Sequence, residues 1–398
     1  MNKLITFIVL ILFLFSCVPK TDTDRCEAKL ESESKLKEIC RDTISFGSEN
    51  SIRSFKLNID TTSCFFINSN IFDTISKHSI HFLRLSSQGK VVEKFPVKFQ
   101  SVIMDYIEND ECFFAISTDR STMGGPSVDY LCKYDKKWKL LWINEIASGM
   151  PPCSKSIITI GSNNEILVIS DIKKNCSGLV FYRFSLDGKK ISERYFRTDN
   201  MCSPFTLMQS NDANYYLTAS LYEAHSHSSL LWLLKIDLFG DTIWTKKYPD
   251  FYPNYAIFTK SSDLLFYGSN YSNKSDSSSG NMYIKIISTD LSGNVKWINE
   301  IKQNYSEYPG NVVELENDNF LFSSSIIPHK DSSHFSYLFV LNSNGILLSE
   351  KKFNFSIGRI SVPIIVNSDN GISMLDYIQT DSFKTPFSNK IIITKLSN

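Results

Sequence analysis

The chain has 398 residues, and its 42 basic side chains balance 42 acidic ones, so it has no net charge at neutral pH. A balanced charge gives no long-range field to attract nucleic acid or anionic lipid, which argues against a nucleic-acid-binding role. Beyond the first segment, no apolar run approaches the roughly eighteen residues that a membrane-spanning helix requires.

The first sixteen residues have the pattern of an export signal. Lys3 precedes an unbroken apolar run over residues 4–15, which is short for a bilayer span. The run passes through Phe15 and a serine into Cys17, which resembles the bacterial lipobox, although phenylalanine is bulkier than the usual residue. We expect residues 1–16 to be a lipoprotein signal peptide and Cys17 to be the lipidated residue of an envelope protein, in the outer membrane on its periplasmic or surface side. An ordinary signal peptide or a buried helix is the alternative.

A polar segment follows the cysteine. Residues 17–41 are rich in Lys, Glu, Asp and Ser, and we interpret them as a lipidated tether. Within the tether, residues 27–39 have the pattern of a short amphipathic helix. The domain is expected to occupy residues 42–398.

A unit of about fifty residues then repeats along the chain. In each copy an apolar strand runs into a turn, usually at glycine, and a second strand follows the turn. The turn position falls at Gly89, Trp138, Gly188, Gly240, Gly293 and Gly345. Two copies are the clearest, one with Lys235, Asp237, Gly240 and Trp244, the other with Lys285, Asp290, Gly293 and Trp297. A period that recurs in several features indicates a repeat architecture.

Two strands can be assigned in every copy. Seven apolar strands precede the turn position, over residues 80–85, 130–134, 180–184, 231–236, 282–287, 337–341 and 391–396. Seven more lie upstream of these, beginning at Phe65, Phe113, Ile166, Tyr215, Leu264, Phe320 and Ile372. The strands after the turn at residues 142–146 and 297–301 share one pentapeptide, Trp-Ile-Asn-Glu-Ile. Each unit therefore offers four strands: inner, second, third and outer.

These units predict an all-β fold, a seven-bladed β-propeller of four-stranded blades. The seventh unit has no outer strand before Asn398, whereas residues 43–46 form a spare strand before the first unit. Pairing of these N-terminal and C-terminal strands would close the ring and remove exposed sheet edges. A sandwich array or an open solenoid explains the missing and spare strands less well.

Loop lengths distinguish the two faces of the predicted disc. The inner-to-second and third-to-outer connections are tight turns that share one face, here called the short-turn face. The opposite long-loop face receives the outer-to-inner links and six long polar loops, at residues 118–129, 171–178, 222–229, 270–281, 327–336 and 378–389. Binding residues concentrate on loops held by a rigid scaffold. Our candidate binding face contains Tyr222, Glu223, His225, His227, Tyr252, Tyr255, Tyr308 and Arg359.

The positions of histidine and cysteine say less about binding sites than the loop lengths do. The six histidines lie in units that are not neighbours, so they do not converge on one ion, and we expect no metal site. Eight cysteines remain after Cys17, and their pairing is not readable from sequence. Cys153, Cys176 and Cys202 share the long-loop face and are the candidate disulfide partners, whereas Cys64 and Cys112 are expected to be buried thiols.

One family resemblance rests on the repeat itself. The Asp, Gly and Trp spacing over residues 233–244 looks like the repeats of quinoprotein-type and related bacterial propellers. Quinoprotein dehydrogenases imply pyrroloquinoline quinone and calcium, but they have eight blades and adjacent cysteines. This chain departs from both features, so we expect no cofactor. Short triplets at Asp42, Asp60, Asp73 and Asp241 also resemble an O-glycosylation motif of Bacteroidetes envelope proteins.

Three classes of function follow from this sequence. The first is a non-catalytic binding or assembly scaffold that meets an envelope protein or a glycan through the long-loop face. The second is an envelope hydrolase or lyase with its active site on the same face, for which Asp129, Asp171 and Glu223 are the acidic candidates. The third is a mainly structural role in the envelope.

Overall fold

The computed structural model describes part of the chain. The backbone is described for residues 37–46, 50–56, 62–69, 80–86, 91–97, 102–119, 127–149, 156–172, 177–223, 228–271, 282–302, 306–327, 334–355, 364–366, 372–379 and 389–397. Side chains are described for residues 103–118, 128–146, 156–172, 177–222, 229–270, 282–302, 308–326 and 335–353. Within these residues the structure has 28 β-strands, and no helix with the length and hydropathy to cross a membrane.

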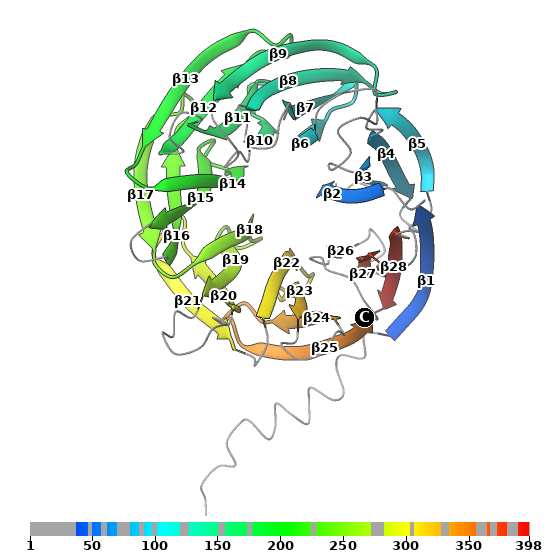
Figure 1. Cartoon of the computed structure of the whole chain (residues 1–398). Coiled ribbons are helices and arrows are strands. Elements are labelled where there is room, and N and C mark those ends of the chain that lie inside the picture. Colours follow the sequence, from blue (N-terminus) through cyan, green and yellow to red (C-terminus); the bar gives the residue numbers. More distant parts are fainter. Residues whose placement is uncertain are drawn as a thin grey trace, which may run out of the picture.

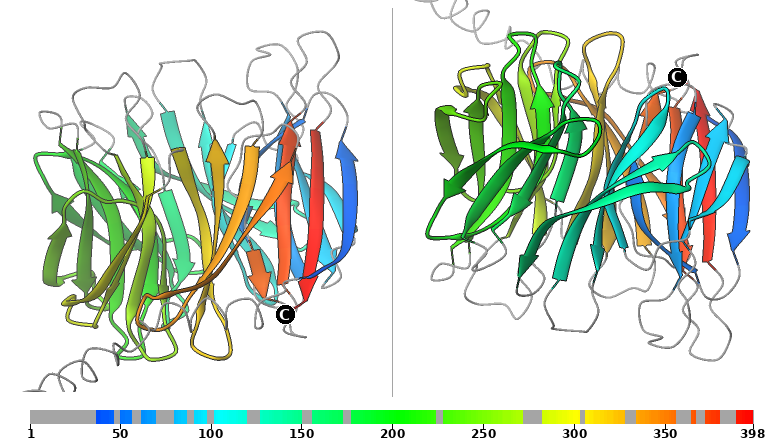
Figure 2. Two further views of the ribbon diagram at one scale, coloured as in Figure 1. Left: turned by 90° about the horizontal axis from the view of Figure 1, so that it is seen from below. Right: turned by 90° about the horizontal axis from the view of Figure 1, so that it is seen from above.

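The strands form four-stranded antiparallel sheets arranged around a central opening (Figure 1). Seven such sheets are present, and in six of them the four strands follow one another in chain order. Five sheets, from β6 to β25, have described side chains, and the other two are described by their backbone. Figure 2 shows the sheets from the side, with strands running from one face of the molecule to the other. This arrangement is that of a β-propeller and confirms the all-β prediction.

Four concentric sets of strands run outward from the opening. The inner strands are β2 (Asn50–Lys56), β6 (Val102–Glu108), β10 (Ser156–Ile160), β14 (Met201–Gln209), β18 (Tyr252–Phe258), β22 (Ser306–Glu314) and β26 (Ile364–Val366). The second strands are β3 (Thr62–Ser69), β7 (Cys112–Asp119), β11 (Ile166–Asp171), β15 (Tyr215–Glu223), β19 (Leu264–Tyr271), β23 (Phe320–Ile327) and β27 (Ile372–Gln379). The third strands are β4 (Ile80–Ser86), β8 (Ser127–Asp135), β12 (Gly178–Phe184), β16 (Ser228–Ile236), β20 (Met282–Thr289), β24 (His334–Leu341) and β28 (Asn389–Ser397). The outer strands are β5 (Val91–Val97), β9 (Leu140–Gly149), β13 (Lys190–Arg197), β17 (Thr242–Tyr248), β21 (Val295–Ile301), β25 (Leu347–Phe355) and β1 (Lys37–Phe46).

The N-terminal strand pairs with the C-terminal one. β1 lies antiparallel to β28, from Lys37 opposite Ser397 to Phe46 opposite Asn389. Strand structure therefore begins at Lys37, inside the predicted tether, and the helix predicted for residues 27–39 is wrong at residues 37–39. The rest of that helix, the signal peptide and Cys17 lie outside the described residues.

The core lies in the second and third strands. Every residue of β11 and β12 is buried, because neighbouring sheets cover both faces of these strands. The outer strand β17 instead alternates between exposed and partly buried positions, as expected for a strand with one face to solvent. The inner strands are the edges of their sheets nearest the central opening (Figure 1).

The predicted equivalence of Lys235 and Lys285 is wrong. Lys235 lies opposite Trp244 across β16 and β17, whereas Ser288 lies opposite Trp297 across β20 and β21. Lys285 is three residues earlier, opposite Glu300. The error arose because β20 carries its basic residue in mid-strand, where sequence spacing alone does not reveal the register.

Trp138 occupies a turn where the other copies have glycine. It adopts a left-handed φ of 60°, and its ring is 3% exposed and stacks on Phe113 with ring centroids 4.4 Å apart. At the turns that contain Gly188 and Gly345, a tryptophan from the outer strand of the preceding sheet covers the glycine. β5, the outer strand before Trp138, has no tryptophan, so the turn residue itself supplies the aromatic ring.

Candidate functional site

On the short-turn face, each glycine turn packs against the outer strand of the preceding sheet. Gly188 and Gly345 adopt φ values of 87° and 77°, a backbone region that glycine enters without steric cost. A Cβ at Gly345 would lie 2.5 Å from the ring of Trp297, and one at Gly188 would lie 2.4 Å from the side-chain amide of Asn144. Both the dihedral angle and the close approach therefore require glycine.

The repeated pentapeptide is part of this contact between sheets. The Asn144 Nδ2 donates a 2.9 Å hydrogen bond to the carbonyl of Gly188, and Asn299 makes the equivalent 2.6 Å bond to Gly345. Trp297 also donates its indole N–H to the carbonyl of Ser343 at 2.9 Å. The pentapeptide is thus explained by sheet-to-sheet packing.

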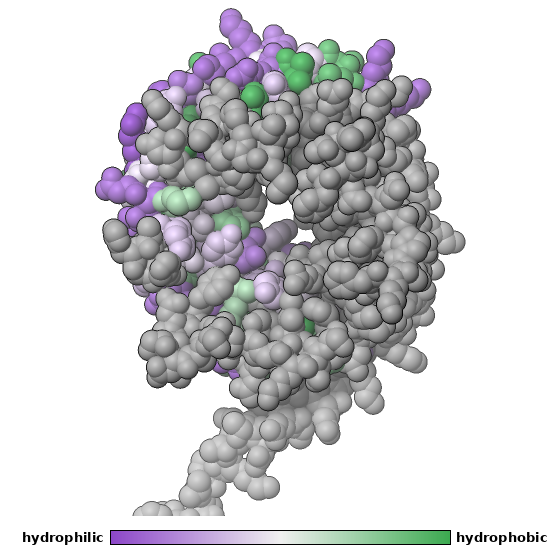
Figure 3. Space-filling view, viewed as in Figure 1, coloured by the Kyte–Doolittle hydropathy of each residue, from purple (hydrophilic) through white to green (hydrophobic). Residues whose placement is uncertain are grey.

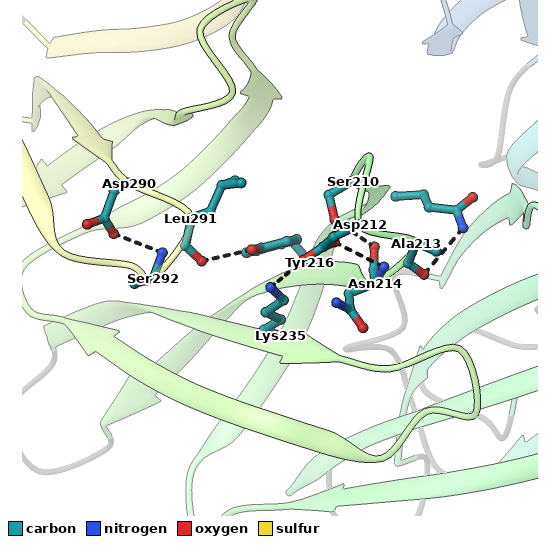
Figure 4. Close-up of polar contacts among 10 residues, drawn as sticks. Ser210, Asp212, Ala213, Asn214, Tyr216, Lys235, Asp290, Leu291 and Ser292 are labelled. Carbon is teal, nitrogen blue, oxygen red and sulfur yellow. Dashed lines mark hydrogen bonds and ion pairs between the residues drawn. The ribbon is translucent and has the colours of Figure 1, made fainter.

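A second polar contact on this face joins the β14–β17 and β18–β21 sheets (Figure 4). Tyr216, fully buried, donates its hydroxyl to the carbonyl of Leu291 at 2.8 Å. Lys235 lies 2.6 Å from a carboxylate oxygen of Asp212. Burial opposes ionisation of Asp212, but hydrogen bonds from Lys235, Ser210 and Asn214 outweigh it and lower the pKa of this carboxyl. The polar groups of the short-turn face therefore bond largely to one another.

Small polar side chains occupy matching positions near the other end of the second strands. Each lies opposite a third-strand residue at the same distance before the turn position. The five are Thr118, Asp171, Ser220, Ser269 and Ser325, all at most 7% exposed. They form a buried polar layer beneath the long-loop face.

Asp129 belongs to this layer. Its side chain is buried, and it accepts hydrogen bonds from the hydroxyls of Thr118 at 2.7 Å and Ser156 at 3.1 Å. Asp171, in the next sheet, is also buried. Burial, and then nearby negative charges that include Asp129 and Asp171, raise the pKa of Tyr182. The two aspartates lie on opposite faces of the β10–β13 sheet: Asp129 bonds Ser156 on one face, and Asp171 shares the other with Leu167 and Ile169. Both carboxylates are buried, so the structure does not bring them together as a catalytic pair.

Exposed side chains gather at the long-loop end of three consecutive sheets. Met201 begins β14 and pairs with Tyr222 near the end of β15, and these side chains are 44% and 40% exposed. Tyr252 begins β18 and Tyr308 lies near the start of β22, with exposed fractions of 36% and 42%. We call Met201, Tyr222, Tyr252 and Tyr308 the mouth residues.

Tyr255 lies deeper along the opening. Its side chain is 37% exposed, yet burial raises the pKa of its hydroxyl. The space-filling view shows an opening through the molecule, with residues of intermediate hydropathy beside it near β14 and β18 (Figure 3).

The predicted binding-face residues divide into two groups. Tyr222, Tyr252, Tyr255 and Tyr308 are exposed, and Tyr222 lies in a strand rather than a loop; their role in binding stays a prediction. The backbone of Glu223 ends β15, and its side chain lies outside the described residues, as do His225, His227 and Arg359. Sequence reasoning missed Met201 and Phe205, which lie in the inner strand β14.

The three cysteines with described side chains, Cys112, Cys132 and Cys202, are buried. Cys202 is 3% exposed, within the core between the β10–β13 and β14–β17 sheets. Cys153 and Cys176 lie outside the described residues. The predicted disulfide among these three cysteines, Cys153, Cys176 and Cys202, therefore stays a prediction. Cys112 is buried as predicted, and burial raises its pKa; burial raises the pKa of Cys132 to about 12. The described side chains include no group of three or more His, Cys, Asp or Glu residues placed to hold a metal ion.

Comparisons with known proteins describe the fold alone. No protein-family model and no curated protein matches the sequence. The β-propeller domain of the Trilobed protease from Pyrococcus furiosus is similar with a TM-score of 0.46 and 10% identity, over 89% of this chain and 95% of that one. A protein of unknown function from Dyadobacter fermentans has a TM-score of 0.43 and 12% identity, over 91% and 99%. A GH93 α-L-arabinofuranosidase of Fusarium graminearum has a TM-score of 0.41 and 11% identity, over 73% and 92%.

Proposed function

We propose that this chain is a lipid-anchored protein of the bacterial cell envelope that acts as a non-catalytic binding or assembly scaffold through its long-loop face. The anchor is Cys17, and the export signal before it supports this placement. The partner is a component of the same envelope.

In this proposal the scaffold is a closed ring of seven blades. The seven four-stranded sheets and the pairing of β1 with β28 support it. The pairing of β1 with β28 supplies the outer strand of the last sheet and links the first and last segments of the ring. A closed ring holds the long-loop ends of its strands in fixed relative positions, which lowers the ordering cost of binding.

The contrast between the two faces is the observation that carries this function. On the short-turn face, polar groups such as Tyr216 and Asn144 are occupied by bonds between sheets. Both faces expose apolar side chains, Phe239 and Ile346 at the short turns and Met201, Tyr222 and Tyr308 at the long-loop end, where Met201 and Tyr222 are paired across neighbouring strands. Exposed tyrosine and methionine side chains on a rigid support are enriched at protein interfaces.

A partner-capture experiment tests the proposal. The full-length tagged chain would be crosslinked in cells and its adducts identified by mass spectrometry, for the wild type and for the double variant Met201→Ser with Tyr222→Ser. A matched control, Ile191→Ser with Tyr195→Ser, changes side chains that are 47% and 50% exposed on outer strand β13. We expect a defined partner that the first variant loses and the control keeps.

Two results would contradict this proposal. One is the absence of any defined adduct with the wild-type chain. The other is equal loss of the adduct in both double variants, because the partner would then not depend on the long-loop face. A Cys17→Ser variant adds an independent arm: we expect it to lose incorporation of labelled fatty acid and to leave the membrane fraction.

A further inference from the structure

The wall of the central opening is aromatic along three consecutive inner strands. β14 contributes Phe205, β18 contributes Tyr252 and Tyr255, and β22 contributes Tyr308. We call these four side chains, three tyrosines and one phenylalanine, the tyrosine wall. The rings of Phe205 and Tyr252 pack edge to face, with centroids 5.3 Å apart and an interplanar angle of 83°, so Tyr252 is held in place by the neighbouring sheet.

Two tyrosines of this wall repeat from one sheet to the next. Tyr252 lies opposite the buried Ser269, and Tyr308 lies opposite the buried Ser325, at the same level of adjacent sheets. Each tyrosine is followed by a buried proline and then by a β-bulge. A bulge re-aims the side chains beside it. The wall therefore presents two rings in equivalent settings, one sheet apart.

These three strands carry no basic residue. β14 and β18 contain no charged residue, and β22 contains only Glu307 and Glu314. Glu314 is at the opposite end of the strand from Tyr308 and accepts the backbone N–H of Lys260. A phosphate or a polyanion would find no positive countercharge on these strands. The lining suits a neutral ligand with apolar faces and hydroxyl groups.

The edges of these strands are closed to an extended peptide. Each inner strand is the edge of its sheet, and a free edge is where a peptide adds a further strand. Pro204, Pro253 and Pro309 each remove a backbone N–H, and a register shift follows each of them. Proline and bulges are the devices that block strand addition. Recognition at this wall therefore depends on side chains.

We propose that the tyrosine wall binds a neutral oligosaccharide, an inference that rests on the proposed binding function and names its ligand. The apolar C–H face of a sugar ring stacks on a tyrosine ring, and tyrosine hydroxyls bond to sugar hydroxyls. Two equivalent tyrosines on adjacent sheets suit a ligand with a repeating ring. Such a ligand carries no charge, in agreement with the lining.

Calorimetric titration of the full-length chain in detergent tests this inference. The probes are neutral hexasaccharides of glucose, mannose, galactose and N-acetylglucosamine, with hexagalacturonate as the anionic comparison and an alternating valine–threonine peptide as the strand-forming comparison. We expect at least one neutral hexasaccharide to bind, and Tyr252→Ala or Tyr308→Ala to weaken it by about tenfold or more. Tyr195→Ala, which removes a 50% exposed tyrosine from the outer strand β13, is the matched control and should leave binding unchanged.

Several outcomes would overturn the inference. They are no binding of any neutral hexasaccharide, binding that Tyr252→Ala and Tyr308→Ala leave intact, or binding of only the anionic sugar or the peptide. Thermal unfolding of each variant shows whether a loss reflects folding, and Tyr252→Phe, which keeps the ring, should retain most of the stacking. If a partner is still captured through Met201 and Tyr222 while no neutral sugar binds, the oligosaccharide inference fails and the proposed scaffold function stands.

Discussion

The contacts between sheets differ at the two ends of the strands. At the short-turn end the same contact recurs from sheet to sheet, with a tryptophan or asparagine over a glycine turn, as at Gly188 and Gly345. At the long-loop end the sheets differ, and only two of those with described side chains present a tyrosine before a proline, at Tyr252 and Tyr308. In this chain, features that recur in most of the described sheets are the contacts that hold the sheets together, and features confined to a few adjacent sheets, such as Tyr252 and Tyr308, mark the surface available to a ligand.

This contrast separates stability from binding. Changes at the short-turn end should lower the free energy of unfolding, because they break contacts between sheets. Changes to exposed side chains at the long-loop end should alter binding and leave stability within about 0.5 kcal/mol. The following predictions begin with the largest expected loss of stability.

Gly345→Ala should be strongly destabilising. The residue has a φ of 77°, and the new Cβ would lie 2.5 Å from the ring of Trp297. A left-handed residue with a Cβ and a steric clash together should lower the unfolding free energy by about 2 to 4 kcal/mol, measured by chemical denaturation. Ser262→Gly is the control: Ser262 has a φ of 64°, so glycine there should be neutral or slightly stabilising. Equal losses in the two variants would contradict the account.

Asp129→Ala should be destabilising by about 1 to 3 kcal/mol, because it removes the buried acceptor of the Thr118 and Ser156 hydroxyls. Asp129→Asn keeps one acceptor and should lose less. Thermal and chemical unfolding measure both variants. A fully stable Asp129→Ala protein would show that the buried polar layer does not hold the sheets together, and would reopen a role for this carboxylate in chemistry.

Tyr216→Phe should lower the unfolding free energy by about 1 kcal/mol, because it leaves the ring in place and removes the hydroxyl that bonds to Leu291 and to Lys235. Tyr195→Phe removes a hydroxyl from an exposed side chain and should have no measurable effect. Equal changes in the free energy of unfolding for Tyr216→Phe and Tyr195→Phe would contradict this prediction.

Asp212→Asn should have the smallest effect and a defined pH dependence. The folded-state pKa of Asp212 is lowered, below an unfolded value of about 3.9, so its stabilising contribution is present above that value and is lost as the pH falls through the folded-state pKa. Because the Asp212 side chain is 41% exposed, the contribution is below about 1 kcal/mol. The difference in unfolding free energy between the wild type and the variant should be present at pH 7 and shrink below about pH 4. A difference that is constant with pH would contradict this assignment.

Much of the fold was predictable because its repeats are local. All seven second strands and all seven third strands coincide with predicted segments, since short apolar runs between turn residues are read directly from the sequence. Register was not predictable where the pattern is ambiguous. The basic residue of β20 lies three positions before the place that matches Lys235, and only strand pairing reveals this.

The candidate site was predictable in part. Tyr252, Tyr255 and Tyr308 were assigned to the channel mouth because they lie in links that enter inner strands. The pairing of Met201 with Tyr222 depends on the register of β14 and β15, which sequence spacing did not provide. The burial of Asp129 depends on packing between sheets, where the Ser156 hydroxyl of the next sheet bonds to it, and sequence spacing did not reveal this.

Site-specific photocrosslinking tests the contrast between the two faces most directly. A photoreactive phenylalanine would replace either Tyr222, 40% exposed at the long-loop end, or Phe239, 57% exposed beside the Gly240 turn on the short-turn face. The full-length chain would be irradiated in the cell envelope and its adducts compared. We expect a defined adduct from position 222 and none from position 239. A partner trapped from position 239 alone, or equally from both positions, would contradict the assignment of binding to the long-loop face.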